Sequence, residues 1–225
     1  MKIVILDTSI FHPQGGGQPD DEGYMVSEDG AVKFTLKGMK IQNDAVWHIG
    51  VYEPEDSSFS VDQKVKCHVD EDKRRIHARV HSAGHLLDIA MMRAGRSDLK
   101  PSKGFHFATG AYVEYIGNID QPDREPLIKK LNEVSKDIIE NTPEDMNVWK
   151  KMCSYEEANE ALEKAGGCPP YIKEGSILRV LKLTEDDWGC PCGGTHVGHV
   201  ADIKGINITK IQKKGKAFRV SYSVA

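Results

Sequence analysis

The chain has 225 residues, of which 39% are hydrophobic and 28% charged, with a formal net charge of −4 at pH 7. These values are typical of a globular protein and exclude a general polycation. No apolar run approaches the roughly 20 residues of a membrane span, and the apolar start is too short for a secretory signal. The five cysteines are odd in number and scattered, so we expect free thiols in a protein of the cytoplasm, without membrane contact.

Residues 1–70 are predicted to form a first domain, a small β-barrel or compact sheet. Short segments rich in Val, Ile and Phe alternate with turns that contain Gly and Asp. The segments are residues 2–6, 32–36, 45–49 and 61–69.

A glycine-rich loop lies inside this first domain, with the sequence Gln-Gly-Gly-Gly-Gln-Pro over residues 14–19. Glycines let the backbone approach another molecule closely and expose its N–H groups. Gly16, Gly17 and Gln18 also spell the tripeptide that peptide-release factors direct at the ester of peptidyl-tRNA, which is an analogy only. The alternative is a flexible loop that joins two strands. We predict that the loop makes this kind of close contact with a bound molecule.

Residues 71–95 are predicted to form a helix that opens the second domain, residues 71–225, with Asp70 or Asp72 as its cap. His81 and His85 are four residues apart, so both imidazoles can face one metal ion. The sequence between them lacks the glutamate of HExxH metalloproteases, which disfavours peptide hydrolysis by that route. Asp88 either orients the His85 imidazole or faces solvent as an ordinary helix acid.

The rest of the second domain is predicted to be α+β, with helices on one face of an antiparallel sheet. His106, between two phenylalanines, either faces the cleft or stacks on a base, and the alternative is a half-buried sheet histidine. The expected helices are residues 122–141 and 154–165, and the expected strands are residues 105–107, 111–116, 146–152, 177–183, 206–211 and 217–224.

A second group of candidate metal ligands lies near the end of the chain, in the sequence Cys-Pro-Cys-Gly-Gly-Thr-His over residues 190–196. Cys192 and His196 supply a thiolate and an imidazole at the same spacing as the helical pair. Together the four residues form a donor set that suits zinc, whereas either pair alone is more often solvated. Cys190 is a second available thiol, but the spacing to His196 favours Cys192.

Basic residues are unevenly distributed along this acidic chain, and no acidic residue follows Asp202. Such patches can follow a phosphate backbone, although the alternative is an ordinary solvated surface. The candidate RNA-binding residues outside the glycine loop are Arg79, Lys103, Lys210, Lys213 and Lys214.

Three motifs in this order resemble the AlaX family, the free-standing relatives of the alanyl-tRNA synthetase editing domain. They are PQGGGQPDDEG at residues 13–23, HSAGH at 81–85 and CGGTH at 192–196. The resemblance covers nearly the whole chain and implies the medium-length AlaX-M type, with a barrel-like first domain similar to that of translation factors.

This resemblance implies hydrolysis of mischarged tRNA(Ala), chiefly Ser-tRNA(Ala) and in some members Gly-tRNA(Ala). It also implies a Zn²⁺ ion held by His81, His85, Cys192 and His196. Gln18 and Thr195 are the candidate catalytic residues. The candidate partners for the substrate's serine hydroxyl are Ser82, Ser102, Thr109 and Thr195. The glycine-rich loop is expected to reach the metal site and to seat the aminoacyl end or the adjoining RNA. We expect no DNA partner and a monomer, because the chain carries no extension like the synthetase dimerisation region.

Two other functions fit part of the pattern. One is a non-catalytic tRNA-binding module in which zinc only stabilises the fold, because four protein ligands form the closed pattern of a structural site. The other is a threonyl-type editing domain, which shares the HxxxH and CxxxH spacings. The N-terminal glycine loop favours the alanyl type.

Overall fold

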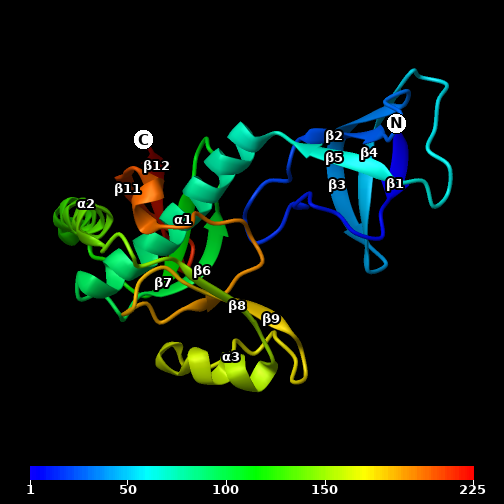
Figure 1. The fold of residues 1–225 in the computed structure, drawn as a ribbon. Helices are drawn as coiled ribbons and strands as arrows, with labels where there is room; N and C mark the ends of the chain where they lie inside the picture. Colours follow the sequence, from blue (N-terminus) through cyan, green and yellow to red (C-terminus); the bar gives the residue numbers. More distant parts are fainter. The chain divides into compact units, whose positions relative to one another are not determined.

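The computed structural model describes all 225 residues, which form two compact units, Met1–Ile76 and His77–Ala225 (Figure 1). The border between the units lies inside helix α1 (Glu71–Arg93). The side chain of Asp70 accepts a hydrogen bond from the Lys73 backbone N–H at 3.1 Å, so Asp70 is the residue that caps this helix. The predicted domain boundary after residue 70 stays a prediction.

The first unit contains a five-stranded antiparallel sheet in the order β1-β4-β3-β2-β5. Each edge strand pairs on one side only, so the predicted closed barrel is not confirmed. Asn43 and Asp44 both have positive φ and form the tight turn between β3 and β4. The strands are β1 (Lys2–Ile5), β2 (Gly23–Ser27), β3 (Lys33–Gln42), β4 (Ala45–Glu53) and β5 (Val65–Val69).

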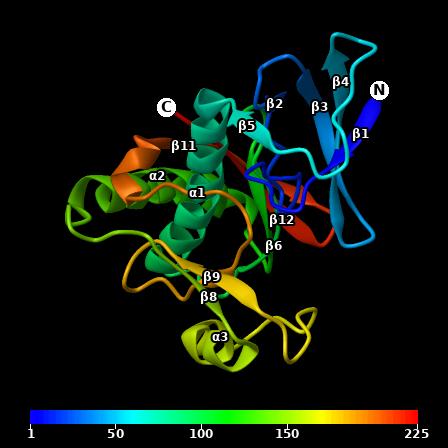
Figure 2. The ribbon, with the colours of Figure 1, turned by 45° about the vertical axis from the view of Figure 1, so that its right-hand side comes forward.

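The main body of the second unit combines helices α1 and α2 (Arg124–Asn141) with a four-stranded antiparallel sheet in the order β11-β12-β7-β6 (Figures 1 and 2). Buried side chains of α1, α2, β7, β11 and β12 share one hydrophobic core. Asn132 on α2 accepts a hydrogen bond from the Ile208 N–H and donates one to the Ile208 carbonyl, both at 2.9 Å. The strands are β6 (Lys100–Phe105), β7 (Tyr112–Ile116), β11 (Ile206–Lys214) and β12 (Ala217–Val224).

A smaller layer of the second unit consists of a three-stranded sheet, in the order β10-β9-β8, and helix α3 (Tyr155–Ala161). Ser154 and Glu157 form a capping box at the start of α3. The strands are β8 (Trp149–Cys153), β9 (Leu178–Lys182) and β10 (Cys190–Pro191). The α+β class is therefore confirmed, but the second unit has two sheets where the sequence analysis expected one.

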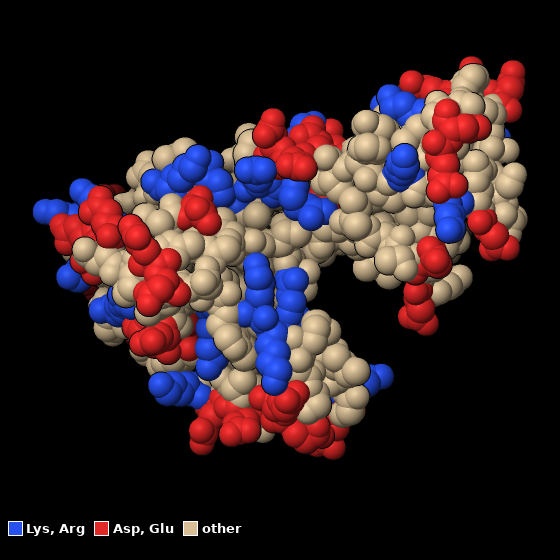
Figure 3. Space-filling model, viewed as in Figure 1, with Lys and Arg blue, Asp and Glu red and all other residues tan.

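Acidic and basic side chains mix over most of the face drawn in Figure 3, and Lys and Arg gather over the region of β8 and β9. These two strands carry Lys150, Lys151, Arg179 and Lys182. No helix of the chain is both long enough and apolar enough to cross a membrane.

Candidate metal centre

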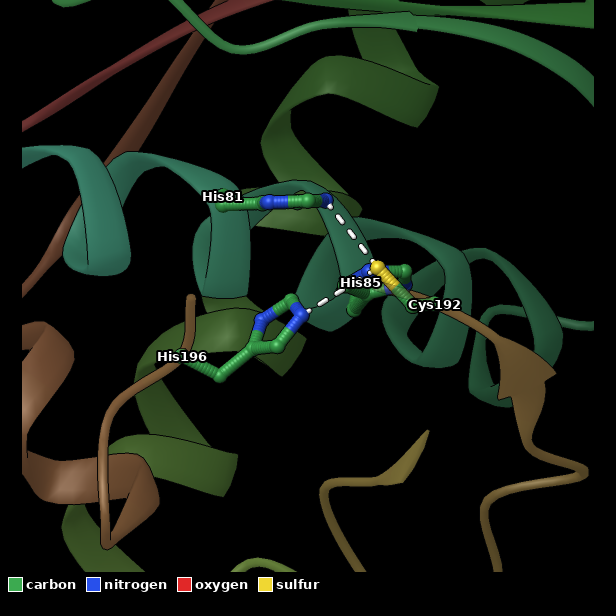
Figure 4. A group of neighbouring side chains, drawn as sticks. All are labelled: His81, His85, Cys192 and His196. Atoms are coloured by element: carbon green, nitrogen blue, oxygen red, sulfur yellow. Dashed lines mark hydrogen bonds between the residues drawn. The ribbon is translucent and has the colours of Figure 1, made fainter. Parts of the chain in front are cut away.

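Four predicted metal ligands meet in the second unit. His81 and His85 project from one face of α1, and Cys192 and His196 project from the loop that follows β10 (Figure 4). Their ligand atoms all lie within 4.8 Å of one another. The two pairs are more than a hundred residues apart in the chain, so the fold itself brings them together.

The distances within the cluster fit a single metal ion. The Cys192 Sγ atom lies 3.5 Å from His81 Nε2 and 3.2 Å from His196 Nε2. In a tetrahedral zinc site, bonds of about 2.3 Å to sulfur and about 2.0 Å to nitrogen place the S and N ligands about 3.5 Å apart. This donor set of three imidazoles and one thiol is also the chemistry that zinc prefers.

Burial sets the protonation of these groups in the absence of a metal. Desolvation, with a smaller contribution from His106, lowers the pKa of His85 to about 3, and desolvation followed by the charge of His85 lowers the pKa of His196 to about 2. Both imidazoles are therefore neutral at pH 7. Burial raises the pKa of the Cys192 thiol, so a metal ion must displace the thiol proton on binding.

Ser82 connects the helix to the ligand loop. Its fully buried hydroxyl accepts a hydrogen bond from the Val197 backbone N–H at 3.1 Å and lies 3.4 Å from Nδ1 of His196. The hydrogen bond to Ser82 fixes Val197, the residue that follows His196, against α1. Ser82 is part of the HSAGH motif, but the spacing of that motif does not reveal that Ser82 bonds to Val197.

Arg179 on β9 holds the other end of the same loop. Its Nε atom donates to the Cys192 carbonyl at 2.9 Å, its Nη2 atom donates to the Gly194 carbonyl, and the Cys192 N–H donates to the Arg179 carbonyl at 2.9 Å. The guanidinium therefore fixes the backbone on both sides of Gly193. Arg179 lies outside the sequence motifs that predicted the site.

His106 packs against the ring of His81. The two rings stack with centroids 4.4 Å apart and planes 18° apart, and His106 Nδ1 lies 2.7 Å from the Tyr222 hydroxyl. His106 is 5% exposed, so its ring is buried and is not open to a stacking base. It directly follows β6, which ends at Phe105, so it does not lie within the sheet as the sequence predicted.

Two glycines make room for His106. A Cβ atom on Gly84 would lie 2.4 Å from His106 Cε1, and one on Gly104 would lie 2.2 Å from His106 Nε2. The glycine in the HSAGH motif is therefore required by a close approach of this imidazole.

Asp88, which follows His85 by one helical turn, and Cys190 lie outside the cluster of four ligands. Asp88 accepts a hydrogen bond from the Tyr115 hydroxyl at 2.5 Å. It therefore matches neither sequence hypothesis, because it does not bond to His85 and does not face open solvent. Cys190 Sγ lies 3.4 Å from His85 Nδ1, but the cluster of four mutually close ligand atoms contains Cys192 in its place. The CxxxH spacing had favoured the same cysteine.

The glycine-rich loop of the first unit is a tight turn. Gly15 and Gln18 exchange two backbone hydrogen bonds, at 3.0 and 3.2 Å, and Gly16 and Gly17 between them have φ values of 57° and 83°. Positive φ at both central positions explains the glycines, and the turn is ordered by its own backbone bonds. The Gln18 side chain is fully buried. Thr195 is half-buried beside His196, and the catalytic roles of Gln18 and Thr195 stay predictions.

The basic candidates are in different environments. Arg79 donates to the carbonyls of Ile203 and Ala225, so its guanidinium stabilises the fold. Lys103 on β6 is exposed, as are Lys210, Lys213 and Lys214 on β11. The lysines of β8 and β9 were not among the predicted RNA-binding residues.

Comparisons with known proteins show the relationships of the chain. A family model described as "tRNA synthetases class II (A)" matches residues 1–73, and one described as "Threonyl and Alanyl tRNA synthetase second additional domain" matches residues 178–219. The alanyl-tRNA editing proteins AlaX-M of Methanosarcina mazei and Methanosarcina barkeri are 31% and 28% identical over 98% of this chain and 86% and 88% of their own lengths.

An alanine–tRNA ligase of Methanospirillum hungatei is 27% identical over 94% of the chain, which corresponds to 22% of the ligase. The similarity to the ligase is thus confined to part of that larger enzyme, whereas the similarity to the free-standing proteins covers most of both chains. The chain belongs to the AlaX-M family of alanyl-tRNA editing proteins.

Proposed function

We propose that this protein hydrolyses the ester bond of mischarged tRNA(Ala) in trans, with Ser-tRNA(Ala) as the main substrate and Gly-tRNA(Ala) as a second one. The observation that carries the proposal is the cluster of His81, His85, Cys192 and His196 in a chain of the AlaX-M family. These four residues would hold a zinc ion. When bound, the ion would polarise an ester carbonyl or acidify a water molecule.

The residues around the cluster support this role. Desolvation keeps His85 and His196 neutral and able to donate their lone pairs, while Ser82 and Arg179 fix the loop that carries Cys192 and His196. An aminoacyl ester is more reactive than an amide, so accurate positioning beside an electrophile supplies much of the required acceleration.

Selectivity requires groups that distinguish serine from alanine by one hydroxyl. A site that bonds this hydroxyl leaves polar groups unpaired when alanine enters, which is a strong basis for rejection. Thr195, adjacent to His196 in the chain, is the proposed partner for the hydroxyl. Gly16, Gly17 and Gln18 are proposed to contact the aminoacyl end of the tRNA, and Lys103, Lys210, Lys213 and Lys214 its phosphates.

A non-catalytic tRNA-binding module remains the second candidate, and one observation favours it. Four protein side chains suffice to fill a tetrahedral zinc site, which is the pattern of a structural metal. The two candidates differ in whether the ester is cleaved.

The deciding experiment measures hydrolysis of Ser-tRNA(Ala) and Ala-tRNA(Ala) by the zinc-loaded protein and by the chelated protein. We expect rapid loss of the seryl ester only with metal, while the alanyl ester persists. Cys192→Ala and His81→Ala should both abolish the reaction. Tight tRNA binding without loss of either ester would favour the binding module.

We also propose a monomer in the cytoplasm. Five free cysteines suit a reducing compartment, and this thiol state keeps Cys192 available as a ligand. Light scattering after gel filtration tests the oligomeric state, and a mass near twice 25.0 kDa would contradict the monomer.

A further inference from the structure

A cavity of about 440 Å³ opens beside the metal cluster, entirely within the second unit. Its volume is in the range of small-molecule sites. Its walls include His85, Asp88, Tyr115, Trp188 and Cys190. Because His85 belongs to the cluster and also lines the cavity, a substrate bound at the metal has this space next to it.

Asp88 is the carboxylate of this cavity that has an oxygen available. Its Oδ1 atom accepts the hydrogen bond from Tyr115, and its Oδ2 atom has no hydrogen-bond or ion-pair partner. Asp187 also lines the cavity, but its two oxygens accept hydrogen bonds from the backbone N–H groups of Gly189 and Leu183, both at 2.8 Å. Asp187 is therefore used by the fold, and Asp88 is the group that can bind a ligand.

The position of Asp88 suits a cation close to the metal. Asp88 follows His85 by three residues on α1, so their Cβ atoms lie roughly 5–6 Å apart on one face of the helix. In an aminoacyl ester the α-ammonium is separated from the carbonyl carbon by a single carbon atom. An ester carbonyl near the metal cluster thus places its ammonium within reach of the free carboxylate oxygen.

We propose that Asp88 binds the α-ammonium group of the aminoacyl ester in the cavity beside the metal cluster. This inference rests on the proposed function and adds the group that selects an amino acid over a neutral acid. The charge balance agrees with it, because burial raises the pKa of Asp88 to about 7 and an entering cation restores the ionised form.

The test pairs a protein change with a ligand change. The first ligand is seryl-3′-aminoadenosine, in which a stable amide replaces the ester, and the second is the 3-hydroxypropanoyl analogue, which lacks only the amine. Dissociation constants of both are measured by calorimetry on the zinc-loaded full chain. We expect the wild type to bind the amine-containing ligand about tenfold to a hundredfold more tightly, as a charge-assisted hydrogen bond gives.

Asp88→Asn should remove this preference and bind both ligands about as the wild type binds the second. Asparagine keeps an acceptor for Tyr115, so the fold is preserved, which circular dichroism checks. Tyr115→Phe leaves the carboxylate in place and should retain the preference. Asp186→Asn is the matched control, because Asp186 pairs with Arg93 on the surface and does not line this cavity.

An unchanged preference in Asp88→Asn would overturn the inference, and so would a wild type that binds the two ligands equally or binds neither. Hydrolysis of Ser-tRNA(Ala) by the same preparations separates the proposed function from the role of Asp88. An inactive wild type would refute the proposed function. An active wild type whose amine preference survives in Asp88→Asn would refute the role of Asp88 alone.

Discussion

His106 shows that the candidate metal site depends on side chains outside the four ligands. Its ring stacks on His81 and lies close to Gly84 and Gly104. In Gly84→Ala the new methyl group would lie 2.4 Å from His106 Cε1 and 2.9 Å from the Tyr222 hydroxyl. We expect this variant to displace His106, to lose about 1–3 kcal/mol of stability, and to bind zinc more weakly. Urea denaturation and competition with a zinc chelator measure the two effects.

The matched control at this scale is Gly198→Ala, whose added methyl group would meet its nearest atom at 3.9 Å. That distance is an ordinary van der Waals contact, so stability and zinc affinity should stay within error of the wild type. If Gly84→Ala behaved like this control, the close approach of His106 would not be a requirement of the site.

Among the elements, the edge strand β11 carries the exposed lysines that the sequence nominated for RNA binding. Lys213→Glu combined with Lys214→Glu should weaken tRNA binding and reduce the slope of log K against log salt by about 0.7–0.9 for each phosphate that the variant no longer neutralises. Filter binding at several salt concentrations measures this slope. The matched control is Lys129→Glu combined with Lys130→Glu, an adjacent exposed pair on α2. It changes the net charge by the same amount. Equal slopes in the two double variants would show that β11 makes no specific contact.

The elements also show how far local sequence patterns reach. Periodicity and caps predicted α1, α2 and α3, and the spacings of His81, His85, Cys192 and His196 predicted the donor set, because these signals lie within a few residues. Strand β2 was missed since it is short and follows the glycine-rich turn, and β10 has only two residues. Local patterns do not determine how strands pair, because the partners are distant in the sequence, and the predicted barrel is not confirmed. The same reason hid the contacts of Ser82, Arg179 and His106, whose partners are remote in the chain.

Over the whole molecule, buried ionisable groups should make the metal-free protein sensitive to mild acid. Burial lowers the pKa values of His85, His106 and His196 to about 3, 4 and 2, whereas an unfolded chain titrates its histidines near 6.5. Between about pH 6.5 and pH 4 the unfolded state therefore binds more protons, and the free energy of unfolding falls as the pH falls. Each histidine contributes about 1.4 kcal/mol per pH unit in this window.

Asp88 acts in the opposite direction. Its pKa is raised to about 7, so between about pH 4 and pH 7 the folded state binds a proton that the unfolded state does not, and stability rises as the pH falls. The buried Asp187 carboxyl, whose pKa is also raised, opposes the histidines in the same way. The net expectation for the chelated protein is a loss on the order of 1–3 kcal/mol per pH unit from pH 6.5 to pH 5. Urea denaturation at half-unit steps measures this loss.

Asp88→Asn makes this prediction specific to the named groups. Removing the opposing carboxyl should steepen the loss of unfolding free energy by about 1.4 kcal/mol per pH unit. Asp186→Asn should leave the slope in this window unchanged, because Arg93 lowers the pKa of that carboxyl. Zinc should make this acid dependence steeper, because a metal-bound Cys192 has lost the proton that its thiol carries in both the metal-free folded protein and the unfolded chain, so the folded state binds fewer protons. If the stability of both the wild type and Asp88→Asn did not change between pH 6.5 and pH 5, the three histidines would be solvated in the metal-free protein.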